Sequence, residues 1–265
     1  MSDDPEAFYL PTSPGHYRPT AATESPWDRA AQHGGPPAAL LAQAVDASVP
    51  GAADGSLRLA RISLDFLGPI PRREVEVEVS PVKPGRRVHL TDARMLVDGR
   101  AVVLARVWHI ATGPTPPAPG APAPTASALP GPTEQRYFAG LDDWGYGRAT
   151  EWRFAVGDFT TLGPADVWTR VRIPLVAGEA PRGLHRALVV ADSANGLSAE
   201  LPMSQWFSIP PTMTTHLLRH PEGEWVNLAA STRLAADGVG LTRADLADAS
   251  GWVGEVAQPL LVAER

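Results

Sequence analysis

The chain has 265 residues, no cysteine and a formal net charge of −6, a balance that argues against a general nucleic-acid-binding protein. The absence of cysteine excludes disulfides, thiolate catalysis and cysteine-ligated metals. With 44% hydrophobic and 20% charged residues, the chain can bury real cores, and its length fits two domains of common size.

The N-terminal stretch MSDDPEAFYL is acidic and has neither the basic region nor the long apolar core of a signal peptide. No later apolar run approaches the roughly 18 residues of a membrane-spanning helix. We therefore expect a cytoplasmic protein with no membrane partner. Cationic residues gather between 58 and 110, where nine Arg and Lys83 face six carboxylates. They suit a solvated strand face, or a surface for the phosphates of a small ligand.

Two glycines and two prolines introduce an alanine-rich segment, HGGPPAALLAQAVDA at 33–47, which predicts a helix from about 35 to 47. The first turn of a helix has unpaired backbone N–H groups and the positive end of the helix dipole. Gly34 and Gly35 leave those groups open to an oxygen atom of a ligand, because glycine has no Cβ. The same residues equally suit a plain helix start. His33 beside them is a substrate-binding candidate or a structural residue.

Four runs with a period of two follow, at 58–68, 73–83, 86–97 and 101–110. In the second run, EVEVEV, the valines share one face and the glutamates the other, as a half-buried antiparallel strand requires. The sequence VDGR at 97–100 predicts the hairpin turn between the last two strands.

The segment TGPTPPAPGAPAPTASALPGPT, at 112–133, consists almost wholly of Pro, Ala, Gly, Ser and Thr. Such a composition predicts an extended surface tether that makes few core contacts. The chain therefore divides into an N-terminal module at 1–111, the linker at 112–133 and a C-terminal module at 134–265.

The second module repeats the order of elements of the first. GLHRALVVADSANGLSAEL at 183–201 takes the position of the helix, and alternating runs follow at 212–219, 224–235, 238–249 and 252–264. This repetition predicts an α+β fold of two tandem modules. Each module is a long central helix wrapped by an antiparallel sheet, and the two modules form one pseudo-dimer.

The order of these motifs resembles the double-hotdog acyl-CoA thioesterases of the thioesterase II type over nearly the whole chain. The resemblance rests on HGGPPAALLAQA after Trp27 and Asp28, RISLDFLGPIP, VVADSANGL, HLLRHPEGEWVNL and GWVGEVAQPLLV. It implies tandem hotdog modules and hydrolysis of fatty acyl-CoA to free acid and CoA by an activated water. It also implies no covalent intermediate, cofactor or metal. Assembly of the double-hotdog chains into homo-oligomers stays open.

Comparison of the two halves locates a candidate site. Alignment of the helices sets Ala44 against Asp192, and alignment of the last strands sets Val107 against Gln258. A carboxylate in the apolar middle of a core helix is costly unless it is paired or used. The resemblance implies that Asp192 is the general base or water-orienting group, and that Gln258 holds the same water. A purely structural hydrogen-bonding role of Asp192 is the alternative.

The third site residue of the resembled family, a threonine, has no direct counterpart. In SIPPTMTTHLLR, Pro210 stands closest to that position, and proline has no hydroxyl group. Thr212 and Thr214, two and four residues further on, would lie on one side of a strand. They are the candidate replacements, with Thr212 preferred.

Other functions stay open at this point. A catalytically inert acyl- or CoA-binding hotdog protein would explain the missing threonine, and a thioesterase for aryl or polyketide thioesters would have the same fold. A hydratase would need an Asp–His pair, and Asp46 has no clear histidine partner in the sequence. Ser198 lies in GLSAE without the second glycine of a nucleophile elbow. Since the H-E-x-x-H zinc motif is also absent, we expect neither a serine nucleophile nor a metal site.

Overall fold

The computed structural model describes residues 6–114, 120, 122–138, 141 and 143–265. The first half contributes β1 (Tyr9–Ser13), β2 (His16–Pro19), β4 (Leu57–Phe66), β6 (Val75–Lys83), β7 (Val88–Val97) and β8 (Arg100–Ala111). The second half contributes β9 (Thr150–Val156), β10 (Ala165–Val171), β11 (Trp206–Ile209), β12 (Thr212–Leu217), β13 (Trp225–Leu234), β14 (Val239–Asp248) and β15 (Gly251–Glu264). A separate short pair consists of β3 (Ala31–Gln32) and β5 (Ile70–Pro71).

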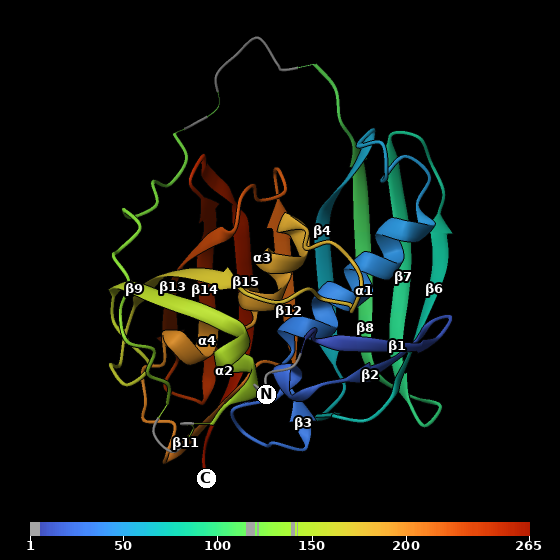
Figure 1. The fold of residues 1–265 in the computed structure, drawn as a ribbon. Coiled ribbons are helices and arrows are strands. Elements are labelled where there is room, and N and C mark those ends of the chain that lie inside the picture. The colour runs from blue at the N-terminus through green and yellow to red at the C-terminus, as the bar shows by residue number, and fades with distance from the viewer. Residues whose placement is uncertain (1–5, 115–119, 121, 139–140, 142) are drawn as a thin grey trace.

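The thirteen strands of the two halves form one antiparallel sheet that curves around the central helices (Figure 1). Their order is β1-β2-β6-β7-β8-β4-β12-β15-β14-β13-β10-β9, and β11 pairs with β15 outside this path. The two halves meet where β4 pairs with β12, with Ile62 opposite Thr215. The predicted pseudo-dimer of two helix-and-sheet modules is therefore confirmed.

The eight strands predicted from alternation are confirmed to within a few residues at each end. The predicted hairpin turn between β7 and β8 is also confirmed. Asp98 and Gly99 have φ angles of 50° and 74°, which is the left-handed geometry that a two-residue hairpin turn requires.

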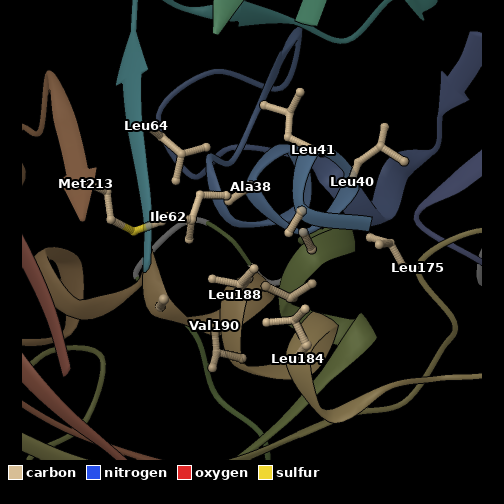
Figure 2. Close-up of a cluster of buried hydrophobic side chains, with 14 of the residues drawn as sticks. Ala38, Leu40, Leu41, Ile62, Leu64, Leu175, Leu184, Leu188, Val190 and Met213 are labelled. Carbon is tan, nitrogen blue, oxygen red and sulfur yellow. The ribbon is translucent and has the colours of Figure 1, made fainter. Parts of the chain in front are cut away.

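The two central helices, α1 (Gly35–Ser48) and α3 (Gly183–Ala191), pack against each other in opposite directions. Their shared core includes Leu40, Leu188 and neighbouring apolar side chains of β4 and β12 (Figure 2). The backbones approach very closely at Gly35, where a Cβ would lie 1.9 Å from the carbonyl oxygen of Val189. Glycine at this position is therefore a packing requirement, since any side chain would force the helices apart.

The helix predicted over 183–201 is wrong in its length. It ends at Ala191, and a short helix, α4 (Ala194–Leu197), follows after Asp192 and Ser193. The N–H of Asn195 would bond to Ala191 in a continuous helix, but it donates to Oε1 of Gln258 at 3.2 Å. A side chain from β15 thus replaces a helical hydrogen bond, which allows the helix to end beside Asp192.

Several elements were not predicted from the sequence. They are the β1–β2 and β9–β10 hairpins, the short β3–β5 pair, the strand β11 and the short helices η1 (Ala21–Thr23) and α2 (Gly145–Ala149). Residues 122–133 have no helix or strand, yet Arg153 donates to Pro130 O and Trp168 Nε1 donates to Ser127 O. This part of the predicted linker therefore lies along β9 and β10. The module boundaries at 111 and 134 stay a prediction, and residues 115–119 and 121 of the linker lie outside the described residues.

The far ends of the two helices are joined by a buried ion cluster. Asp46, near the end of α1, contacts Nε2 of His109 on β8 at 2.8 Å, and Arg182 donates to its other oxygen at 2.8 Å. The expectation that Asp46 lacks a histidine partner is therefore wrong. Burial would raise the pKa of Asp46, but the hydrogen bonds from His109 and Arg182 outweigh that effect and lower it.

In the part of the chain that the structure describes, no helix is long and apolar enough to cross a membrane.

Beside this cluster, His185 is buried in the first turn of α3, and neither ring nitrogen has a hydrogen-bond partner among the described residues. Burial, together with Arg182 and Arg186 and against the attraction of Asp46, lowers the pKa of His185 to about 4. His220 nearby adds to the lowering. Folding therefore keeps this ring neutral at a pH where a free histidine is half protonated.

The first prediction concerns the pH dependence of stability. Between pH 6.5 and 4 the unfolded chain binds a proton at His185 that the folded chain does not bind, so the free energy of unfolding falls as the pH falls. The variant His185→Leu lacks this proton. Between pH 7.5 and pH 4.5 we expect the unfolding free energy of the variant to fall by roughly 2 to 3 kcal/mol less than that of the parent chain. Urea unfolding at both pH values measures this difference, and parallel pH profiles would contradict it.

Candidate active site

A cavity of about 370 Å³ lies between the two halves, beside the N-terminal end of α1. Its wall comes from residues 25–34 and 66–70 of the first half, and from three aromatic residues between 138 and 159 and the region 192–211 of the second. Much of the lining is aromatic, with Trp27, Phe66, Phe138, Trp144, Phe159 and Phe207. A mainly apolar cavity with a few convergent polar groups is the usual form of a small-molecule site.

Asp192 is the polar centre of this cavity. It follows the last residue of α3 and is 8% exposed. Its Oδ2 accepts the backbone N–H of Gly34 at 2.9 Å, and its Oδ1 accepts Nε2 of the fully buried Gln258 at 3.0 Å. The structure therefore brings Asp192, Gln258 and Gly34 together, although they come from α3, β15 and the start of α1.

The two halves of the Gln258 amide have different partners. Its Nε2 donates to Asp192, while its Oε1 accepts the N–H of Asn195. The Asn195 side chain in turn donates to Ser208 O at 3.0 Å. These contacts fix the amide orientation of Gln258, so that its N–H group, and not its oxygen, faces the carboxylate.

His33 forms the other polar wall of the cavity. Its Nδ1 accepts the backbone N–H of Gly35 at 3.2 Å and lies 3.4 Å from Asp192 Oδ2. Burial lowers the pKa of His33, and the nearby charge of Asp192 offsets this only in part. The ring is therefore neutral at pH 7, and its single proton lies on Nε2 because Nδ1 is the acceptor. The ring stacks on Tyr146, with centroids 4.2 Å apart.

The first-turn N–H groups of α1 are not free. The N–H of Gly34 bonds to Asp192 and that of Gly35 bonds to His33. The sequence predicted that both groups would face a ligand oxygen, and the structure gives each of them an acceptor within the protein. The donor that remains is Nε2–H of His33, which has no hydrogen-bond partner among the described residues, while His33 itself lines the cavity.

The structure does not bring the two candidate threonines to this site. Thr212 donates its hydroxyl to Leu64 O, and the Thr214 hydroxyl lies 2.9 Å from that of Ser63. Pro210 and Pro211 line the cavity instead. Both hydroxyl groups therefore serve the junction of β12 with β4.

Sequence reasoning gave no role to Asn195, Ser193 or Tyr146, which also belong to the site. The Tyr146 hydroxyl donates to Val189 O at 2.8 Å and lies 3.0 Å from Ser193 Oγ. Burial raises the pKa of Tyr146 far above its ordinary value, so the ring stays neutral under His33. The sequence offered a signal only for Ser193 and Asn195, which belong to the polar run DSAN in the segment predicted as a core helix. Nothing in the sequence pointed to Tyr146.

The chemistry of other enzyme classes has little support in the described residues. No group of three or more His, Asp or Glu side chains there is arranged to hold a metal ion. Ser198 is fully buried and donates to Ala194 O at 2.8 Å, so its hydroxyl is not an exposed nucleophile.

Comparison with protein families gives two matches that together span most of the chain. Residues 23–110 match the acyl-CoA thioesterase N-terminal domain, and residues 117–262 match the acyl-CoA thioesterase C-terminal domain. No curated protein matches the sequence.

Three solved structures illustrate the likeness in fold. A protein assigned as a thioesterase II from Thermobifida fusca YX has a TM-score of 0.72 and 19% identity, over 97% of this chain and 96% of that one. A hot dog fold protein of unknown function from Alicyclobacillus acidocaldarius has a TM-score of 0.71 and 16% identity, over 94% and 92%. The acyl-CoA thioesterase II TesB2 from Mycobacterium marinum has a TM-score of 0.65 and 15% identity, over 97% and 96%. At these identities the likeness establishes the fold, which is the predicted double hotdog.

The second prediction compares the two neighbouring glycines. A Cβ on Gly35 would meet the backbone oxygen of Val189 at 1.9 Å, whereas a Cβ on Gly34 would meet only side-chain atoms of Asp192 and Phe66, each at 2.8 Å. Backbone cannot yield without separating α1 from α3, but side-chain ends can rotate. We expect Gly35→Ala to lower the free energy of unfolding by about 3 kcal/mol or more, and Gly34→Ala by about 1 kcal/mol or less. Chemical unfolding of both variants measures this, and equal losses would contradict it.

Proposed function

We propose that this chain, which belongs to the acyl-CoA thioesterase family, hydrolyses acyl-CoA to free acid and CoA. The attacking water is activated by Asp192. Family membership supports thioesterase activity in general, and the site supports the finer assignment. One observation carries it: the Asp192 carboxylate is held by Gly34 and Gln258 at the wall of an apolar cavity. A buried carboxylate held only by neutral donors keeps lone pairs for a water molecule.

In the proposed reaction, Asp192 takes a proton from the water while the water oxygen bonds to the thioester carbon. The carbonyl oxygen becomes an oxyanion, and Nε2–H of His33 donates a hydrogen bond to it. Gln258 keeps the carboxylate in place through its hydrogen bond to Oδ1. The carbon–sulfur bond then breaks, and the thiolate receives the proton held by Asp192. The products are a carboxylic acid and a free thiol.

A direct attack by water fits the groups around the cavity better than a covalent intermediate. The chain has no cysteine, and the Ser193 hydroxyl lies against the Tyr146 hydroxyl. The Nδ1 atom of His33 is occupied by Gly35, so this ring is not a base for a serine. Activation of a nucleophilic hydroxyl requires such a base within hydrogen-bonding reach.

The alternatives differ in what they need from the site. The Asp46–His109 pair is the acid and histidine combination that a hydratase would use, but His109 is fully buried and neither residue is in the lining of the cavity. An inert acyl- or CoA-binding protein would bind substrate without turnover. A panel of straight-chain, aryl and polyketide-like acyl-CoA substrates, followed by detection of the released thiol, separates these functions and identifies the acyl group.

The third prediction is that Asp192→Asn lowers kcat by roughly 10² to 10⁴ while the protein stays folded. Asparagine keeps the size of the side chain but cannot accept the proton of water. Initial rates with the preferred acyl-CoA and a thermal unfolding curve of the same sample measure both effects.

The matched control is Asp46→Asn, which changes the other buried helix aspartate. We expect this variant to lose stability but to keep kcat within a few-fold, because Asp46 binds Arg182 and His109 away from the cavity. Full activity of a folded Asp192→Asn variant would remove Asp192 from the mechanism. An equal loss in both variants would indicate a general structural effect.

The fourth prediction concerns the two threonines. Since the hydroxyls of Thr212 and Thr214 are directed to Leu64 O and Ser63, we expect Thr212→Val and Thr214→Val to keep kcat within a few-fold. Loss of one hydrogen bond should cost stability by about 1 kcal/mol. A fall in kcat of a hundredfold or more in Thr212→Val would contradict this and indicate that the Thr212 hydroxyl contacts the reacting water.

A further inference from the structure

The cavity has a feature that its proposed substrate does not explain by itself: its lining is poor in positive charge. Among the described lining residues the acidic side chains are Asp28 and Asp192, His33 is neutral, and there is no Arg or Lys. Thioesters of CoA, and of the phosphopantetheine arm of carrier proteins, have phosphate groups at the far end of the pantetheine chain. A cation for those groups has to come from outside the lining.

A cation lies at the rim of the cavity. The guanidinium of Arg265 lies over the Phe207 ring at 4.6 Å from its centroid and over the Trp27 ring at 5.4 Å. Both rings line the cavity, and both are exposed, Trp27 by 41% and Phe207 by 37%. They therefore form the mouth of the cavity, and the guanidinium of Arg265 packs on these two rings.

This arginine is held in place by backbone contacts. The strand β15 pairs with β11 up to Glu264, which lies opposite Trp206. The N–H of Arg265 then donates to Gln205 O at 3.0 Å. Cation–π contacts with two rings orient the guanidinium but leave its N–H edge available for hydrogen bonds.

Arg265 has no carboxylate partner within ion-pair distance among the residues that the structure describes. By contrast Arg29, which follows the lining residue Asp28 in the chain, is 4.0 Å from Glu24 and donates to Asp143 O. The guanidinium of Arg265 is thus not engaged in an ion pair with an Asp or Glu side chain of the described residues. A guanidinium with this freedom, beside aromatic rings at the mouth of a binding cavity, is suited to a phosphate oxyanion, because its planar N–H groups match the phosphate oxygens.

We propose that Arg265, held over Trp27 and Phe207, binds a phosphate of the substrate carrier at the mouth of the cavity. This inference rests on the proposed thioesterase function and deepens it. Arg265 is then a residue that determines specificity for the carrier and takes no part in the bond-breaking step. Its effect lies in KM and is reduced by salt, since exposed charges are screened beyond about 8 Å at physiological ionic strength.

The test compares three thioesters of one acyl group: acyl-CoA, acyl-4′-phosphopantetheine and acyl-pantetheine, which has no phosphate. We expect Arg265→Gln to raise KM for the phosphorylated substrates roughly tenfold with unchanged kcat, and to leave acyl-pantetheine unaffected. The salt dependence of kcat/KM for acyl-CoA should weaken in the same variant. The control Arg233→Gln changes an exposed arginine of β13 that does not line the cavity, and we expect it to behave as the parent chain.

The outcomes separate the sources of the phosphate. A loss with both phosphorylated substrates supports recognition of the 4′-phosphate, and a loss with acyl-CoA alone supports recognition of the nucleotide phosphates. An equal loss with acyl-pantetheine, or unchanged KM for acyl-CoA, would overturn the proposal. Failure of the parent chain to hydrolyse any of the three would refute the proposed function instead. Calorimetric titration of CoA into the parent and Arg265→Gln chains then decides on the phosphate contact, with equal Kd values counting against it.

Discussion

The close approach of the first turn of α1 to the last turn of α3 is the contact on which the site depends. It is possible only because Gly35 has no side chain, since a Cβ there would lie 1.9 Å from Val189 O. At this separation the N–H of the preceding residue, Gly34, donates a hydrogen bond to the carboxylate of Asp192. Asp192 is the residue directly after the end of α3. A helix N-terminus stabilises a negative charge placed on its axis. The packing of two helices in the core thus places the Asp192 carboxylate against the N-terminal end of α1, at the wall of the cavity.

The internal duplication places a second contact of this kind at the other end of the helix pair, with different chemistry. There Asp46 is bound by Arg182 and His109, so an ionised guanidinium neutralises its charge. Asp192 is bound by two neutral donors, a backbone N–H and the Gln258 amide. A guanidinium opposes protonation of a carboxylate far more strongly than a neutral donor does. The carboxylate at one end of the helix pair is therefore held by neutral donors beside the cavity, and the carboxylate at the other end is paired with Arg182 and His109, which ties α1 to α3 and β8.

The sequence predicted those parts of the fold that have a clear period. The strands β4, β6, β7, β8 and β12 to β15 alternate, and the turn at Asp98 and Gly99 has residues that accept positive φ. The strands β1, β2, β9 and β10, which form the two ends of the sheet, were missed because their pairing partners, and not a regular alternation, define them. The duplication located Asp192 and Gln258, since each is polar where the other copy is apolar. It could not give the directions of the Thr212 and Thr214 hydroxyls, because those depend on which oxygens of β4 lie across the junction. The partner of Asp46 was missed for the same reason, since His109 lies 63 residues away in the chain.

The glycines that open α1 act through histidine and aspartate, and not directly on a ligand. The N–H of Gly35 fixes Nδ1 of His33 as an acceptor, so the ring proton is on Nε2. Burial keeps that ring neutral, and stacking on Tyr146 fixes its plane. The helix terminus therefore presents two prepared groups to the cavity, a carboxylate held by Gly34 and an imidazole N–H set by Gly35. A neutral donor beside a carboxylate avoids the ion pair that a charged imidazolium would form with Asp192, and such a pair would lower the basicity of the carboxylate. The tautomer of His33 is thus a condition for the proton transfer proposed for Asp192, and the helix N-terminus sets it.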